Sequence, residues 1–451
     1  MENYVLLVFV IGYLLIAFEG VSKVNKSGIA LLMSVICWSL FMVSGTKDGN
    51  TEIGSIFSAH VSETCETILF LMGAMTIVEV IDSNGGFNFI TNRLKTYNPK
   101  SLLWKTVALT FVLSALLDNM TTCIVMVMVL KRLVADRRMR MIYAGMIVLA
   151  ANAGGAFSPI GDVTTIMLWI KGCVTSEGII KSLLLPSIVC TLVPACIVSA
   201  RMHGKLSVPV GSNSAYRDAD IGVERIDFMF ARGERIAIFC IGVLGLMFVP
   251  VFRNITNLPP FVGVMGVLAV LWIVTEIMIH RNKRLLKVED KVRVASIIKK
   301  IDMSTILFFL GILLAVGALQ ETGLLNSLGV WLSDAFENVY VVNSIIGVLS
   351  SVVDNVPLVA SAMGMYEIQP AGTVGEMAVY CQDGTFWELL AYCASTGGSL
   401  LIIGSAAGVV AMGLENINFG WYMKHFTLLA LVGYVSGILT YWLQSYMVGG
   451  M

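Results

Sequence analysis

Long apolar blocks separated by shorter polar ones run through the whole chain. A helix that crosses a bilayer needs about 20 apolar residues. Blocks near that length lie at about 4–18, 28–44, 64–81, 141–170, 182–202, 236–253, 261–280, 304–320, 387–412 and 426–446. Two further apolar segments, 101–133 and 341–365, each carry an Asp-Asn pair near the centre. The pattern predicts an all-α polytopic membrane protein.

The two Asp-Asn pairs are the feature of the pattern that would cost the most free energy in lipid. Asp118-Asn119 and Asp354-Asn355 both stand inside apolar runs, in similar surroundings. A carboxylate there must face protein or a water-filled cavity, and such residues usually mark an ion path. The repetition predicts two halves built around one buried site.

Composition supports a membrane protein and limits the partners that are expected. The chain has 451 residues, of which 57% are hydrophobic and 13% charged, against about 25% charged in soluble proteins. The lipid bilayer is therefore an expected partner. The formal net charge is zero, so nucleic acid is not. The nine cysteines lack metal-ligand spacing, and no cofactor is expected.

Basic residues indicate how the chain crosses the membrane. All 30 Lys and Arg residues lie in alternate loops, apart from Lys47, Lys171, Lys181 and Arg253. Loops rich in Lys and Arg stay in the cytoplasm. The rule predicts a multi-pass protein of a bacterial inner membrane with both termini in the periplasm.

The same rule gives the Asp-Asn segments an unusual path. Basic residues flank the first on both sides, and acidic residues such as Asp334 and Glu367 flank the second. Each segment then enters and leaves from one side, which predicts two re-entrant hairpins with the Asp-Asn pairs at their tips. Irregular backbone at that depth requires cover by protein or water. The alternative is that each segment forms one long buried helix.

Internal similarity supports two halves. Residues 67–73 resemble 305–311, and residues 152–162 resemble 395–405, in spans predicted to run in opposite directions. We therefore expect inverted repeats at 1–205 and 236–451, joined by a cytoplasmic linker at 206–235. Each repeat would hold five transmembrane helices, one of them broken, and one hairpin. Inverted repeats with discontinuous helices are a design of secondary transporters.

Glycine and proline at 154–161 predict the broken helix of the first half, and oxygen-bearing side chains surround it. Small hard cations prefer such oxygen ligands. The predicted cation- and proton-binding residues are Asp118, Asn119, Thr121, Thr122, Asn152, Ser158, Asp162, Thr164 and Thr165. The predicted supporting residues are Ser114, Ser350, Asp354, Asn355, Ser395, Thr396, Ser399 and Ser405.

The two halves differ in carboxylates. Ser405 stands where the first half has Asp162, so Asp118 and Asp162 are the predicted sodium ligands. A buried carboxylate can hold a proton at one stage and a cation at another. Asp354 would support them or carry an extra proton. For the hydroxyls, ordinary hydrogen bonding between helices is the alternative.

These motifs resemble those of NhaD-type sodium/proton antiporters over nearly the whole chain. The resemblance rests on five stretches, which are residues 73–79, 114–122, 151–165, 354–359 and 396–408. It implies the ion-transporter superfamily fold, a homodimer and elevator-like alternation. It also implies exchange of sodium, and of lithium, for protons.

Two other functions are alternatives to sodium/proton exchange. More distant members of the superfamily carry dicarboxylates with sodium and have Ser-Asn-Thr at the hairpin tips, where this chain has Asp-Asn. A sodium-coupled organic anion symporter is therefore the main alternative. An intramembrane aspartyl protease would need Gly-x-Gly-Asp, whereas the run here is Pro159-Ile160-Gly161-Asp162. We expect a transporter and not an enzyme.

Overall fold

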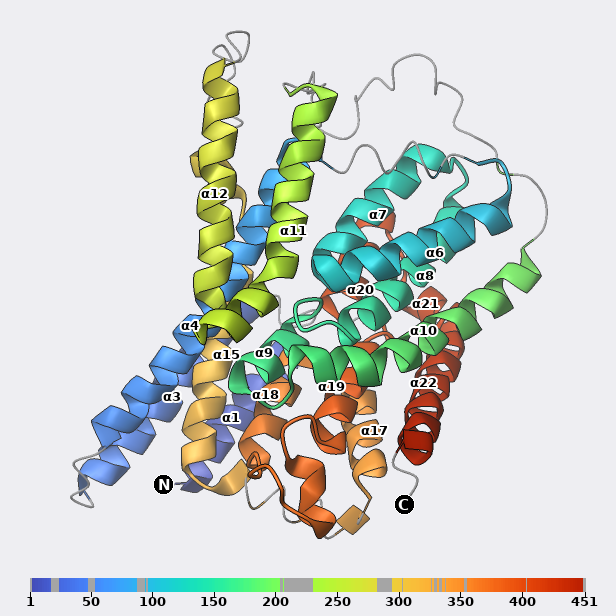
Figure 1. Ribbon diagram of the computed structural model, residues 1–451. Helices are drawn as coiled ribbons and strands as arrows, with labels where there is room; N and C mark the ends of the chain where they lie inside the picture. The colour runs from blue at the N-terminus through green and yellow to red at the C-terminus, as the bar shows by residue number, and fades with distance from the viewer. Residues whose placement is uncertain are drawn as a thin grey trace.

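The computed structural model (Figure 1) describes residues 2–17, 24–47, 53–86, 94, 96–202, 206, 230–281, 294–301, 303–325, 327, 331, 335–336, 338–352, 355–402 and 404–448. Within these ranges every regular element is a helix, apart from one isolated bridge between Gln369 and Cys381. The all-α polytopic fold class is thereby confirmed. The inverted repeats and re-entrant hairpins stay predictions.

Seven helices in the described ranges are long and apolar enough to cross a membrane. They are α3 (Lys26–Lys47), α4 (Ile53–Ser83), α10 (Ser176–Arg201), α11 (Arg232–Thr256), α12 (Pro260–Arg281), α15 (Met303–Glu321) and α22 (Thr427–Val448). The predicted start of α4 at residue 64 is wrong. The helix begins at Ile53 and runs through a more polar stretch before residue 64, in which Ser58, Ser62 and Glu63 are exposed.

Shorter helices come in pairs where the sequence predicts interrupted segments. The pairs are α6 (Pro99–Leu116) with α7 (Asn119–Leu133), α8 (Arg137–Ala156) with α9 (Val163–Lys171), α17 (Val339–Leu349) with α18 (Asn355–Met365), and α19 (Thr385–Gly397) with α20 (Ala406–Glu415). The remaining helices are α1 (Glu2–Ala17), α14 (Val294–Ile297), η2 (Ile298–Lys300), η3 (Gly375–Tyr380) and α21 (Phe419–His425). Most of the predicted linker lies outside the described residues.

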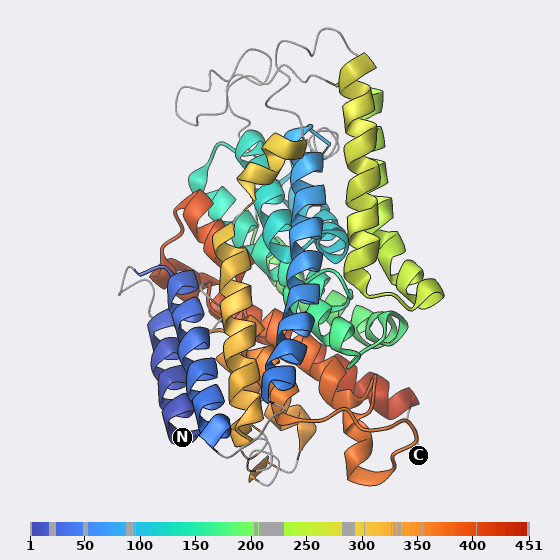
Figure 2. The same cartoon turned by 90° about the vertical axis from the view of Figure 1, so that its left-hand side faces the viewer.

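Helix packing divides the molecule into two groups. In one group α4 and α15 run side by side through the middle (Figure 2), with α3 and α12 packed against them. In the other, the paired short helices pack mostly on one another, with α10 and α22 against α6, α8 and α19, and α18 also packs against α15 of the first group. The short helices therefore meet one another in the interior and not at the lipid-facing surface.

Many of these contacts occur twice, once in each half. Helix α1 packs on α3 as α11 packs on α12, and α6 packs on α8 as α17 packs on α19. Helix α1 begins and α22 ends at the same end of the molecule (Figures 1 and 2). This matches the expectation that both termini lie on one side, and the side itself stays a prediction.

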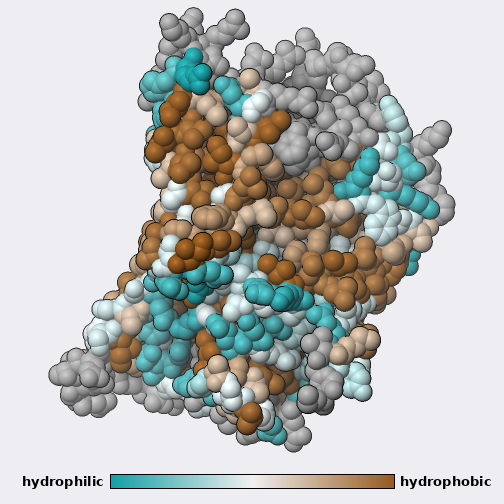
Figure 3. Space-filling view, viewed as in Figure 1, coloured by the Kyte–Doolittle hydropathy of each residue, from teal (hydrophilic) through white to brown (hydrophobic). Residues whose placement is uncertain are grey.

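The surface separates apolar from hydrophilic regions. Figure 3 shows apolar residues over α11 and α12 and along α10, with hydrophilic residues gathered below them. Leu244, Phe248, Val270 and Ile273 are among the exposed apolar side chains of α11 and α12. Such a surface suits lipid contact, because a soluble protein seldom exposes apolar area of that extent.

Glycine allows the hairpin-like pairs to approach the broken helices. A Cβ atom at Gly154 in α8 would clash with the carbonyl oxygen of Phe111 in α6. At the equivalent place, a Cβ at Gly397 in α19 would clash with the carbonyl oxygen of Gly347 in α17. Backbone contacts of this kind require small residues.

Substitution of Gly154 tests this contact. We expect Gly154→Ala to lower the free energy of unfolding by roughly 1–3 kcal/mol, because the added methyl group forces α6 and α8 apart. Thermal unfolding in detergent measures the change. Gly266→Ala in α12 is the control, since a Cβ there meets nothing within 4 Å. Equal stability of the two variants would contradict the close packing.

Candidate ion-binding site

Asp162 begins the half-helix α9 at the centre of the molecule. The chain is extended at Asp162, and its Oδ1 accepts a hydrogen bond of 3.1 Å from the backbone N–H of Thr164. The hydroxyl of Thr165 donates back to the Asp162 carbonyl at 2.9 Å. An aspartate suits this position because it accepts from free N–H groups and faces the positive end of the helix dipole.

The carboxylate of Asp162 also joins the two halves of the chain. Its Oδ2 accepts hydrogen bonds from Asn119 Nδ2 at 2.8 Å and from the Ser395 hydroxyl at 2.6 Å. Asn355 Nδ2 lies 3.5 Å from its Oδ1. Asp162 is only 2% exposed, so these bonds replace water around the carboxylate.

Asn152 lies beside Asp162 and extends the network. Its Oδ1 accepts from Asn119 Nδ2 at 3.1 Å, and its Nδ2 donates to the hydroxyls of Ser399 at 2.8 Å and Ser405 at 2.9 Å. Its backbone carbonyl oxygen lies 2.9 Å from the Ser395 hydroxyl, which shares its one hydrogen between this carbonyl and Asp162. The structure thus brings three predicted residues of the first half (Asp162, Asn152 and Asn119) together with three predicted serines of the second.

Asp118 occupies the start of another half-helix. It caps α7, and its Oδ1 accepts a hydrogen bond of 2.7 Å from the backbone N–H of Thr121. Asp118 is half-buried, whereas the neighbouring Asn119 is buried in the network. Asp354, the predicted counterpart of Asp118, lies outside the described residues.

Four further predicted hydroxyl side chains donate to backbone carbonyls. Ser114 donates to Ala151 at 2.5 Å, Ser158 to Ala115 at 2.6 Å, and Ser350 to Ala394 at 2.7 Å. These three bonds join a hairpin-like pair to a broken helix in each half. Thr396 instead donates to Tyr392 of its own helix at 2.6 Å. Each of these hydroxyl groups uses its hydrogen in a bond that holds the backbone in place. Its oxygen lone pairs can still accept a hydrogen bond.

Two predicted threonines have buried hydroxyls without a hydrogen-bond partner. They are Thr122 in α7 and Thr164 in α9, both fully buried. Buried threonines usually bond a carbonyl of their own helix, as Thr110 does to Thr106 at 2.7 Å. An unpaired buried hydroxyl costs free energy unless a ligand or water meets it.

The arrangement can hold one small cation or one proton among oxygen atoms. Carboxylate, amide and hydroxyl oxygens converge from half-helices α7 and α9 and from the second-half helix α19. Alkali cations prefer such ligands. The N-terminal ends of α7 and α9 stabilise the ionised form of the aspartates that cap them.

Several polar contacts around this centre were not predicted from the sequence. Arg253 of α11 donates to the Trp169 carbonyl at the far end of α9, at 2.6 Å. Glu388 of α19, which is buried, accepts from the Tyr441 hydroxyl at 2.6 Å. The sequence did carry a signal for both residues, because each is a charged residue that interrupts a long hydrophobic stretch.

Comparison with known proteins identifies the class. Residues 13–380 match the family model described as a citrate transporter. The chain is 42% identical over 438 residues to sodium/proton antiporter 1 of Arabidopsis thaliana, covering 96% of this chain and 71% of the relative. It is 30% identical over 466 residues to the Na(+)/H(+) antiporter NhaD of Vibrio cholerae, covering 98% and 91%. The chain is therefore a membrane transporter and not an enzyme.

The extent of these matches also fixes the family. The alignments run over the hairpin-like pairs, both broken helices and the polar centre described above. The chain belongs to the NhaD-type sodium/proton antiporters of the ion-transporter superfamily. The resemblance seen in the sequence motifs is thereby confirmed.

The serine bonds between helices can be tested by stability. We expect Ser114→Ala and Ser350→Ala each to lower the free energy of unfolding by about 1 kcal/mol, because each variant loses a hydrogen bond between two helices. Ser361→Ala is the control, since its hydroxyl bonds Pro357 of the same helix. Thermal unfolding in detergent is the measurement. A control as destabilised as the other two would contradict this assignment.

Proposed function

We propose that the protein exchanges sodium, and also lithium, for protons across the membrane by alternating access at the centre around Asp162. The observation that carries the proposal is a buried carboxylate with oxygen-bearing neighbours from both halves of the chain. The printed names of the relatives, sodium/proton antiporter and Na(+)/H(+) antiporter, support it.

Proton and cation compete for the same oxygens in this proposal. Ser395 and Asn119 donate to Oδ2 of Asp162, which suits the ionised carboxylate. When Asp162 is protonated, the Ser395 hydroxyl can rotate and accept, because a hydroxyl is both donor and acceptor. A sodium ion would instead draw the oxygens of these side chains inward. One carboxylate thus serves both ions, but not at the same time.

In this proposal, Asp118 and Asp354 determine how many protons are exchanged for each cation. Asp118 supplies a second carboxylate one residue from Asn119, at the terminus of α7. Asp354 carries a further proton or supports the site. Exchange is electroneutral or electrogenic according to how many of the three titrate.

Alternation requires the centre to face each side of the membrane in turn. We assign α3, α4, α12 and α15 to a scaffold, and the paired short helices with α10 and α22 to a transport unit. Their separate packing supports that division. Inverted repeats, re-entrant hairpins, a homodimer and elevator-like movement belong to the same proposal, because relative motion of two units would bring the centre to either side.

The compartment and orientation also stay predictions. We propose a bacterial inner membrane with both termini in the periplasm, from the placement of Lys and Arg. The relatives come from a plant and from bacteria.

A sodium-coupled carboxylate symporter is the second candidate, and the family description as a citrate transporter favours it. Carboxylate substrates usually bind Arg, Lys or several free N–H groups. The hydrogen bonds to Asp162 described above come from neutral amides, a hydroxyl and a backbone N–H. A buried carboxylate at that place would repel an anion, so cation exchange is the better match.

Removal of the carboxylates tests the exchange. In proteoliposomes, we expect sodium or lithium to drive a pH change that Asp162→Asn and Asp118→Asn each abolish, because neither amide can release a proton. Glu177→Gln, at an exposed residue of α10, is the control and should retain the wild-type rate. Exchange that persists in both aspartate variants would refute the mechanism. Sodium-driven succinate uptake would support the symporter.

The unpaired hydroxyls of Thr122 and Thr164 give a second test. We expect that neither Thr122→Val nor Thr164→Val lowers the sodium-free melting temperature, because neither variant loses a hydrogen bond within the protein. Each should raise the KM for sodium about tenfold, the effect of losing roughly 1.4 kcal/mol of binding. Thr191→Val is the control, since Thr191 bonds Ser187 of its own helix at 3.1 Å. An unchanged KM in both variants would exclude these hydroxyls as ligands.

A further inference from the structure

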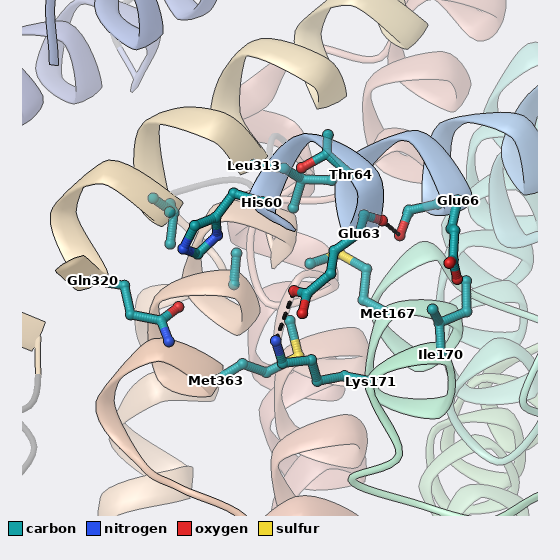
Figure 4. Close-up of a pocket in the computed structure, with 14 residues that line it drawn as sticks. His60, Glu63, Thr64, Glu66, Met167, Ile170, Lys171, Leu313, Gln320 and Met363 are labelled. Atoms are coloured by element: carbon teal, nitrogen blue, oxygen red, sulfur yellow. Dashed lines mark hydrogen bonds and ion pairs between the residues drawn. The ribbon is translucent and has the colours of Figure 1, made fainter. Parts of the chain in front are cut away.

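A cavity of about 210 Å³ lies where the two helix groups meet. Helices α4 and α15 form one wall, and half-helices α9 and α18 form the other (Figure 4). At about 30 Å³ per water molecule, the volume holds roughly seven waters, enough for a hydrated small ion. We call this space the α4–α9 cavity.

The cavity is directly beyond the buried centre along two helices. Helix α9 begins after Asp162, and Met167 and Ile170 on the same helix line the cavity. Helix α18 begins at Asn355, and Ala360 and Met363 line the cavity. At 1.5 Å per residue, Met167 is about 7–8 Å along the helix from Asp162. The centre and the cavity are thus separated by one to two helical turns.

The polar lining offers oxygen ligands. Glu63 and Glu66 of α4 contribute carboxylates, and Gln320 of α15 contributes an amide. Thr64 of α4 is only 6% exposed and also lines the cavity. Figure 4 shows Glu63 between His60 and Gln320 on one side and Glu66 on the other. A buried hydroxyl beside two carboxylates is an environment that suits a small cation and not an anion.

A lysine side chain already forms an ion pair with one of these carboxylates. Lys171 at the end of α9 pairs with Glu63 of α4, with Nζ 2.7 Å from Oε2 (Figure 4). His60 of α4 pairs in turn with Glu321 of α15 at 2.8 Å. The Lys171 ammonium therefore competes with any free cation for Glu63, and the positive charge of Arg253 in α11 acts on Glu66.

We propose that the α4–α9 cavity is a second, weaker cation-binding site that concentrates sodium at the entrance to the Asp162 centre, and that Lys171 limits its occupancy. The inference rests on the proposed exchange function and identifies where the cation first binds. Charged clefts of this kind raise the local concentration of an ion by ten-fold or more. Substitutions here change the apparent affinity for sodium and leave the maximal rate unchanged.

Variants that remove either a negative or a positive charge from the cavity provide the transport test. With sodium added on the cavity side, we expect Glu66→Gln and Thr64→Val to raise the KM about threefold to tenfold, and Lys171→Gln to lower it by a similar factor. In about 1 M choline chloride, where the Debye length is about 3 Å, the two charge variants should approach wild type, whereas Thr64→Val should not. Glu177→Gln, which removes an exposed carboxylate that does not line the cavity, is the matched control.

A second measurement needs no transport. In a variant with the exposed Cys65 and Cys196 replaced by Ser, Met363→Cys places a thiol in the cavity. Its reaction rates with aminoethyl and sulfonatoethyl methanethiosulfonates report whether the cavity favours cations. The cationic reagent should react faster, and the ratio of rates should fall with Glu66→Gln and rise with Lys171→Gln.

The two measurements separate the possible failures. A wild-type protein without sodium-driven pH change, but with the expected thiol ratios, would refute the exchange function and leave the cation-selective cavity supported. A wild-type exchanger whose KM and thiol ratio change less than twofold in Glu66→Gln, Thr64→Val and Lys171→Gln would overturn the second site. A single loosened structure cannot imitate shifts of opposite sign from Glu66 and Lys171.

Discussion

Backbone polar groups freed inside a membrane must find partners, and the architecture of this protein depends on that constraint. Three half-helices begin in the interior with a capping side chain, which is Asp118 for α7, Asp162 for α9 and Ser405 for α20. Serines from neighbouring helices bond nearby carbonyls. The same side chains that satisfy the broken helices also form the oxygen-rich centre around Asp162, so in the proposed function folding and ion binding use one set of atoms.

The sequence predicted the interruptions well, because glycine, proline and aspartate stand out within apolar runs. It also predicted which residues gather at the centre, among them Asp162, Asn152 and Ser395. It did not predict which atoms pair, since Ser395 and Asp162 are 233 positions apart. The Lys171–Glu63 pair, separated by 108 positions, escaped for the same reason. The start of α4 was misplaced because its first turns are more polar than the apolar run that follows, and hydrophobicity marks only that run.

Half-helix α9 connects the parts of the molecule. One end carries Asp162 in the centre, and the other is held from outside its own group by Arg253 of α11 and by Glu63 of α4. The Arg253 guanidinium also lies over the Trp169 ring, 4.9 Å from its centroid. The hydrogen bonds around Asp162, in contrast, all come from the paired short helices of one group.

The inequality of Asp162 and Ser405 has a consequence for how such a protein could arise. The two residues occupy matching positions, and Asn152 donates to Ser405 while Asn119 bridges Asn152 and Asp162. A chain built from two copies of the first half would bring two buried carboxylates into one network, and like charges there repel strongly. A duplicated ancestor with aspartate in both places would have needed an extra proton or cation to fold. Loss of one carboxylate would have freed the other to release its ion.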